Sequence, residues 1–181
     1  MRFRLALSLA AIVPSILAAQ AAQQAAASTS PVADAFRMQT ARYAKIIPAA
    51  AELMPADKYG FKPTPEQMSF GDIDVHLIEA NDGLCGMVAG TKAAAHPTLV
   101  ATSAKDSLVA QLKSSFDFCT ASFASLTDAN MAKSMTMFGM TGNQAFWLFV
   151  NVGDWADHYS QFANYMRLNG QLPPTARRAT Q

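Results

Sequence analysis

The chain has 181 residues, of which 51% are hydrophobic and only 15% are charged, and its formal net charge is +1. A charge this close to zero provides no broad basic surface, so we expect no nucleic-acid partner. Loss of Arg2 and Arg4 with the first residues would remove two positive charges and change the formal charge from +1 to −1, which supports the same exclusion.

The beginning of the chain has the pattern of a secretory signal peptide. Arg2 and Arg4 precede the apolar run LALSLAAIVPSILAA, and an A-Q-A triplet follows at positions 19–21. The run is too short for a membrane anchor, because about 20 apolar residues are needed to span a bilayer. We therefore expect residues 1–21 to be removed and residues 22–31 to form a flexible leader. The mature protein would be exported, periplasmic or secreted, with no membrane contact.

Helical periodicity marks four segments of the remaining chain. They are, in chain order, residues 32–54, 69–90, 103–125 and 143–168. Ser69 and Asp72 form a capping box that opens the second segment, and Ser103 and Asp106 repeat the pattern at the third. Pro48 is expected to kink or shorten the first helix. No segment shows the alternation of a strand.

This pattern predicts an all-α protein with a four-helix bundle over residues 32–174. Asn169-Gly170 ends the last helix, and Pro173-Pro174 prevents its continuation. Residues 175–181 are expected to form a disordered tail.

Polar residues at the centre of the last, otherwise apolar helix indicate a site. Asp154 and His158 are four residues apart and therefore emerge on one helix face. His76 lies at the edge of the apolar stripe of the second helix, and bundle cores build metal sites from such facing positions. Two imidazoles and one carboxylate would hold one divalent cation and leave coordination positions open.

The same residues also allow a plainer interpretation. A D-x-x-x-H pair alone is a weak signal, and a single histidine on a helix edge is more often structural. Asp157 is the one candidate for a general base, but it is equally explained as a solvent-facing residue, so the sequence assigns no catalytic residue. No second Glu-x-x-His, haem-attachment motif, phosphate loop or G-x-S-x-G motif is present.

The runs MPADKYGFKPTPEQMSFGDIDVHLIEAN and DHYSQFANYMRLNGQLPP resemble the DinB family, in the branch that bacteria export. The similarity extends from Phe36 to Pro174, and the ending Y-x-R-L-N-G-x-x-P-P is its most specific part. The resemblance implies a metal-binding bundle of up-down-down-up topology, with a long crossover between helices two and three. Its usual ligands are three histidines. His76 and His158 match the first and last, whereas Asp154 replaces the middle one.

The resemblance also implies a range of functions. Aspartate is a competent ligand for Zn, Fe, Mn or Ni, and its oxygen favours the harder of these metals. Relatives include metal-dependent thiol S-transferases and a thiol-dependent isomerase, so a transferase or hydrolase that acts on a small-molecule substrate is expected. The alternative is a non-catalytic exported stress-response or binding bundle with a degenerate metal site. A homodimer is compatible with either function.

Cys85 and Cys119 would meet an oxidising compartment after export. Cys85 lies sixteen residues after Ser69, and Cys119 lies sixteen after Ser103. If helices two and three are parallel, both cysteines lie about 24 Å from the shared end, at about 1.5 Å of rise per residue. The connection 91–102 can return along the bundle, at up to roughly 3.3 Å per residue. We predict a disulfide between parallel helices, with two buried free thiols as the alternative.

Overall fold

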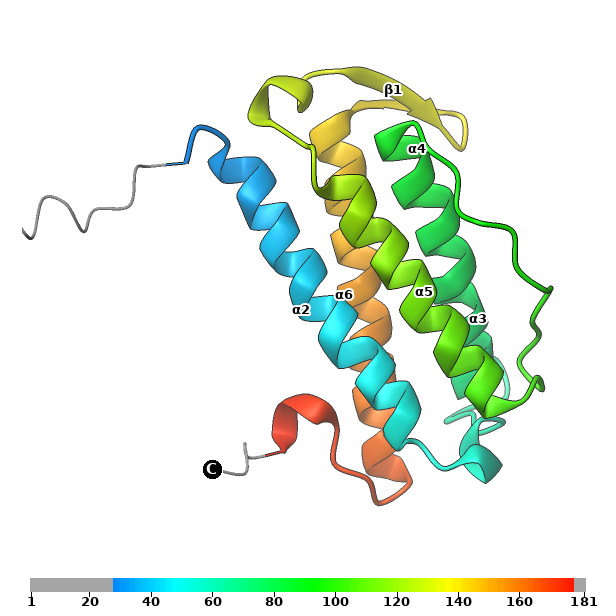
Figure 1. Ribbon diagram of the computed structural model, residues 1–181. Helices are drawn as coiled ribbons and strands as arrows, with labels where there is room; N and C mark the ends of the chain where they lie inside the picture. Colours follow the sequence, from blue (N-terminus) through cyan, green and yellow to red (C-terminus); the bar gives the residue numbers. More distant parts are fainter. Residues whose placement is uncertain (1–27, 178–181) are drawn as a thin grey trace, which may run out of the picture.

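A computed structural model describes residues 28–177 of the chain, and its long helices pack side by side (Figure 1). The helices are α2 (Pro31–Leu53), α3 (Phe70–Ala80), α4 (Gly86–Ala89), α5 (Lys105–Phe123) and α6 (Gln144–Leu168). Short 3-10 turns are η1 (Ala56–Lys58), η3 (Asp128–Asn130) and η4 (Pro174–Ala176). The predicted helical bundle is confirmed. The expected signal peptide, residues 1–21, and residues 22–27 of the expected leader lie outside the described residues.

The second predicted helix is present but not uniform. Its capping box forms as expected, because Ser69 N donates to Asp72 Oδ2 at 2.9 Å and Asp72 N donates to Ser69 Oγ at 3.1 Å. One π-helical turn, η2 (Asn81–Cys85), then separates α3 from α4. Such a turn inserts an extra residue into the helix and often marks a functional region. The helix ends at Gly90, whose φ of 69° is left-handed, as expected of a glycine cap.

The third helix begins differently from the prediction. Ala104, not Ser103, is the N-cap, and no side chain caps this end. The Ser103 hydroxyl instead accepts a hydrogen bond from the backbone of Val100 at 3.0 Å. The expected capping box at Ser103 and Asp106 was therefore wrong, because the hydroxyl is used by the turn that leads into the helix.

A β-hairpin between α5 and α6 contradicts the prediction that no strand is present. Strands β1 (Ser134–Met137) and β2 (Met140–Asn143) pair in antiparallel register. The two turn residues, Phe138 and Gly139, have φ angles of 51° and 76°, as a tight hairpin turn requires. The hairpin lies across one end of the bundle, above α4 and α6 (Figure 1). Its four-residue strands are too short for alternation to be recognised in the sequence.

Helices α3 and α5 are neighbours that run in the same direction (Figure 1). The start of α3 lies beside the residues that precede α5, since a Cβ added at Gly71 would lie 2.4 Å from the carbonyl oxygen of Ala101. Near the other end, Cys85 and Cys119 form the predicted disulfide, with Cα atoms 5.1 Å apart. The connection between α4 and α5 runs back along the outside of the bundle (Figure 1).

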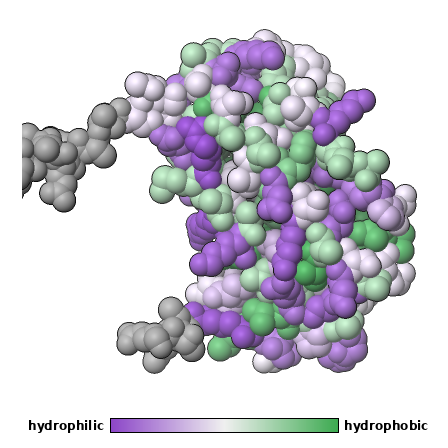
Figure 2. All heavy atoms as spheres, viewed as in Figure 1, coloured by the Kyte–Doolittle hydropathy of each residue, from purple (hydrophilic) through white to green (hydrophobic). Residues whose placement is uncertain are grey.

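Aromatic side chains fill the core between the helices. The rings of Phe70 and Phe162 stack at 4.0 Å, and Trp155 packs against Phe116 at 5.4 Å and Tyr43 at 6.0 Å. On the outer surface of α2 and α5, hydrophilic and hydrophobic residues are intermixed (Figure 2). No helix within residues 28–177 combines the length and apolarity needed to cross a membrane.

Residues 174–177 are more ordered than expected, whereas residues 178–181 lie outside the described part of the chain. Residues 175–181 were predicted to be disordered, but η4 (Pro174–Ala176) returns to α6, where Tyr159 donates its hydroxyl to Thr175 Oγ1 at 2.8 Å. The backbone of Thr175 in turn donates to the Tyr159 hydroxyl at 3.2 Å. Burial of the Tyr159 side chain requires a partner for its hydroxyl, and Thr175 provides it.

Candidate metal centre

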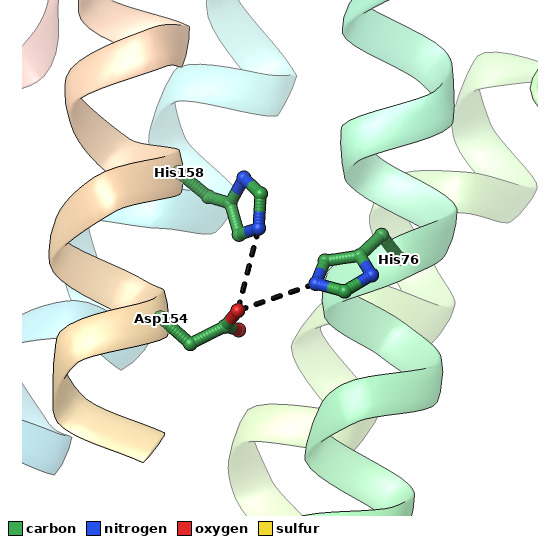
Figure 3. A group of neighbouring side chains, drawn as sticks. All are labelled: His76, Asp154 and His158. Atoms are coloured by element: carbon green, nitrogen blue, oxygen red, sulfur yellow. Dashed lines mark hydrogen bonds and ion pairs between the residues drawn. The ribbon is translucent and has the colours of Figure 1, made fainter. Parts of the chain in front are cut away.

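Helices α3 and α6 bring the three predicted ligand residues together. Asp154 and His158 lie one turn apart at the middle of α6, and His76 faces them from α3 (Figure 3). Asp154 Oδ1 lies 3.2 Å from His76 Nε2 and 3.3 Å from His158 Nε2. The three donor atoms lie within 4.8 Å of one another.

The cluster lies at the edge of the bundle, not in its centre. The exposed fraction of the side chain falls from 41% for His76 through 21% for Asp154 to 11% for His158. His158 therefore forms the inner wall and His76 the outer one. A ligand could approach from the solvent side of His76, whereas the core closes the opposite side.

The protonation of Asp154 reflects two opposing effects. Burial would raise the pKa of its carboxyl, but hydrogen bonds from His158 and His76 outweigh burial and lower the pKa to about 2. The hydrogen bond with Asp154 raises the pKa of His76, with burial acting in the opposite direction. Asp154 is therefore an anion at any physiological pH, ready to attract a cation.

The donor set fits a divalent transition metal. Two ligands that each lie about 2.1 Å from one ion are separated by about 3.0–3.4 Å, and both histidine–aspartate distances fall in this range. Asp154 Oδ2 and His158 Nδ1 are buried and have no hydrogen-bond partner within residues 28–177. A carboxylate with one committed and one free oxygen can bind an ion through either or both of them.

A buried polar network holds this part of α6 in place. Trp155, the residue after Asp154, donates its indole N–H to Asn81 Oδ1 at 2.7 Å. Asn81 lies in the π turn and donates to Ser115 Oγ on α5 at 2.9 Å. The sequence interpretation missed this network. The signal was present, because Asn81 occupies the apolar stripe between Leu77 and Leu84.

Asp157 and His96 are two polar residues that lie outside the cluster. Asp157 is exposed and accepts a hydrogen bond from Gln161 at 3.0 Å, outside the cluster. His96 is half-buried, with Nε2 2.8 Å from Asp82 Oδ2 and Nδ1 2.9 Å from the carbonyl oxygen of Pro97. Neither residue contributes a donor atom to the three-residue cluster.

Solved structures with similar folds support the architecture. A DinB-like protein from Bacillus cereus superposes with a TM-score of 0.67 at 13% identity, covering 78% of this chain and 95% of that one. A DinB-like protein (YjoA) from Bacillus subtilis gives 0.62 at 16% identity, covering 79% and 98%. At these identities the likeness concerns the fold alone.

The sequence itself decides the family, because the model of the DinB superfamily matches residues 35–165. The chain belongs to the DinB superfamily. No curated protein matches it. The resemblance to the DinB family inferred from the two sequence runs is thereby confirmed, and DinB membership agrees with the helical fold. The cluster of His76, Asp154 and His158 occupies the place at which α3 and α6 of this DinB chain face each other.

Proposed function

We propose that this DinB-superfamily protein binds one divalent transition metal (Zn, Fe, Mn or Ni) through His76, Asp154 and His158. The observation that carries the proposal is the convergence of two imidazole nitrogens on one carboxylate oxygen at the distances expected of shared ligands. DinB membership supports it. The superfamily's typical three histidines are changed here to two histidines and an aspartate.

The activity that fits this site best is that of a metal-dependent transferase or hydrolase. When bound, the ion would act as a Lewis acid and lower the pKa of a coordinated thiol or water. The three side chains occupy one side of the ion and leave the solvent side to a small-molecule substrate. His158 excludes water from the inner side, and the carboxylate of Asp154 keeps one negative charge next to the reacting group.

The alternative is a non-catalytic exported bundle in which the metal site is degenerate. Two observations favour it. The two histidines already satisfy Asp154 Oδ1 without an ion. In addition, His158 Nδ1 has no partner within residues 28–177, although metal-bound histidines usually donate this N–H. In this case the cluster would only connect α3 to α6.

We also propose that residues 1–21 are a signal peptide and that the protein is exported, to the periplasm or outside the cell. The Cys85–Cys119 disulfide supports this, because disulfides persist in oxidising compartments. The parallel course of α3 and α5, with the return segment between them, supports an up-down-down-up topology with a long crossover. N-terminal sequencing of the protein from the exported fraction tests the cleavage.

Metal analysis of protein purified without a His tag tests the metal site. After incubation with Zn, Fe(II), Mn or Ni and removal of free ion, we expect about one equivalent of one metal in the wild type. His158→Ala and Asp154→Asn should each retain less than a tenth of this amount. His96→Ala is the matched control, because His96 lies outside the cluster and should leave the metal content unchanged.

Thermal unfolding separates the two functions. A ligand that binds only the folded state stabilises it by about 2.7 kcal/mol at a hundred times its dissociation constant, which raises the melting temperature by several degrees. The metal-binding proposal expects this rise in the wild type and in His96→Ala, but not in His158→Ala. If none of the four metals raises the melting temperature, and metal analysis finds no bound metal, the non-catalytic bundle is the remaining interpretation.

A further inference from the structure

A cavity of about 600 Å³, widely open to solvent, lies beside the cluster on the outer face of α3. One wall is α3, from Asp72 to Glu79, and the other is the crossover segment 98–101. His76 lines this cavity and is also a member of the cluster. Its volume is in the range of small-molecule sites.

The lining of this cavity combines apolar and polar side chains, and Asp72 and Glu79 are its carboxylates. Its apolar lining residues include Val75 of α3, Leu99 and Val100 of the crossover, and Met68, which precedes α3. Within residues 28–177 no lysine or arginine lines it. A bound molecule would therefore lie against aliphatic side chains and beside carboxylates.

The two carboxylates differ in their availability. Asp72 accepts hydrogen bonds from the backbone and the hydroxyl of Ser69, at 2.9 and 2.6 Å, as part of the helix cap. Lys62 also lies 3.9 Å from this carboxylate. Glu79 is exposed and makes no hydrogen bond or ion pair with any residue between 28 and 177. Glu79 is therefore the group free to bind a positively charged ligand.

We propose that this cavity binds the organic substrate of the metal centre, and that Glu79 selects molecules with a protonated amino group on an aliphatic chain. The chain lies against Val75, Leu99 and Val100, and the ammonium group pairs with Glu79. The substrate then reaches the centre past the exposed edge of His76. This inference rests on the proposed function for its link to the metal, but the binding itself does not require an ion.

Binding of three probes with the same chain length tests the proposal: hexylamine, hexanol and hexanoate, titrated by NMR at pH 7. The protein is used as purified and again after dialysis against EDTA, because an amine can also coordinate a metal directly. We expect hexylamine to bind most tightly in both forms and to shift resonances of residues 72–79 and 98–101. Hexanoate, which Glu79 repels, should bind most weakly.

A matched pair of variants identifies the role of Glu79. Glu79→Gln should weaken hexylamine binding about three-fold, as expected of a solvent-exposed ion pair, and leave hexanol binding unchanged. Asp117→Asn removes an equal charge from the exposed face of α5 and should change neither. Equal binding of hexanoate, an unchanged affinity in Glu79→Gln, or shifts confined to another face would each overturn the proposal.

The result of the amine-binding test can be distinguished from the result of the metal-binding test. Amine binding in a protein that takes up no metal would support the cavity site and contradict the proposed function. One equivalent of metal in a protein that does not bind hexylamine at this cavity would support the function and contradict the substrate class.

Discussion

Two aspartates on the first turns of α3 show how far position changes the behaviour of one residue type. Asp72 caps the helix, and hydrogen bonds from Ser69 lower the pKa of its carboxyl. Asp74 points into the core, is 0% exposed, and has no partner for either oxygen within residues 28–177. Burial raises the pKa of Asp74 to about 7. The neighbouring Tyr59 does not relieve it, because its hydroxyl donates to the carbonyl of Ala51 at 2.7 Å.

The environment of Asp74 predicts that this residue destabilises the fold at alkaline pH. Its pKa is raised on folding, so its contribution is most favourable below the unfolded pKa of 3.8 and is lost as pH rises to about 7. Asp74→Asn should therefore stabilise the protein at pH 8, by about 1–3 kcal/mol, because the buried charge is removed. At pH 5 the effect should be smaller, because Asp74 is then protonated in the folded state and only part of its contribution has been lost. Urea denaturation of EDTA-treated protein at both pH values measures it.

The helix cap supplies the control for this prediction. Asp72→Asn removes a carboxylate whose pKa is lowered on folding, so it should destabilise the protein at pH 8. That contribution is present above pH 3.8 and is lost as pH falls through the folded pKa. Destabilisation by both variants at pH 8 would show that Asp74 is charged and satisfied, contrary to the prediction.

Residue-scale features were only partly accessible from the sequence. Asp154 and His158 could be selected from their four-residue spacing and His76 from its place at the edge of an apolar stripe, and both histidines also match those typical of the family. Asp74 was not noticed, because one polar residue within a largely apolar helix can face either side. Asn81 was missed for a similar reason. Its role depends on Trp155 and Ser115, which lie far away in the sequence and meet it only in the folded chain.

At the scale of elements, the crossover between α4 and α5 is attached to the α3–α4 helix at three points. A Cβ added at Gly71 would lie 2.4 Å from Ala101 O, and one at Gly86 would lie 2.8 Å from Thr91 O. Both contacts bring the crossover backbone against a helix, so larger residues would force it away. Between them, His96 of the crossover contacts Asp82 of the π turn at 2.8 Å.

The geometry of His96 makes this central attachment dependent on pH. Nδ1 faces the Pro97 carbonyl oxygen and Nε2 faces Asp82, so both nitrogens must carry a proton to donate to both. These two hydrogen bonds, with Pro97 contributing most, raise the pKa of His96. Asp82 and Glu79 are the negative groups near His96. Lys92 lines a second surface cavity together with His96 and Asp82.

We therefore expect the crossover to be held more firmly at acid pH. The stabilisation is fully present below pH 6.5, the unfolded value, and is lost as pH rises through the raised folded pKa. Hydrogen exchange of residues 91–101, measured at pH 5.5 and 8.5 and corrected for intrinsic rates, should show greater protection at pH 5.5. His96→Gln should abolish this difference. NMR titration of His96 should give a pKa above 6.5 that falls in Asp82→Asn but not in Asp117→Asn.

The element boundaries show which signals the sequence carries. The helices were predicted within a few residues, because each one buries an apolar stripe of regular spacing. Two local features were wrong. The hairpin after α5 has only four residues per strand, and its turn depends on Phe138 adopting a left-handed conformation that sequence does not favour. Ser103 is a good capping residue, but the turn after Val100 uses its hydroxyl first.

At the scale of the whole molecule, one disulfide connects the end of the helix that carries His76 to α5. The disulfide joins Cys85, in the π turn after α3, to Cys119 on α5. Asn151 of α6 donates to Cys85 Sγ at 3.1 Å, one turn before Asp154. The bond therefore fixes the register between the α3–α4 helix and α5 and encloses the crossover, and the hydrogen bond from Asn151 connects α6 to it. Equal distances from the two predicted helix starts indicated this pairing, although the cap assigned to the second start was wrong by one residue.

The last prediction concerns the contribution of this bond to the fold. The cysteines are separated by 34 residues, and a loop of this length stabilises the folded state by about 3–4 kcal/mol in the chain-entropy model. The double variant Cys85→Ser, Cys119→Ser should lose that amount in urea denaturation. Reduction with dithiothreitol should destabilise the wild type to a similar extent and leave the double variant unchanged. Because the bond fixes α3 against α5, the variant should also exchange the amides of residues 81–89 faster at pH values where it remains folded. Two alkylatable thiols in unreduced, denatured wild type would show that the bond is absent, and equal stability of wild type and variant would show that it does not support the fold.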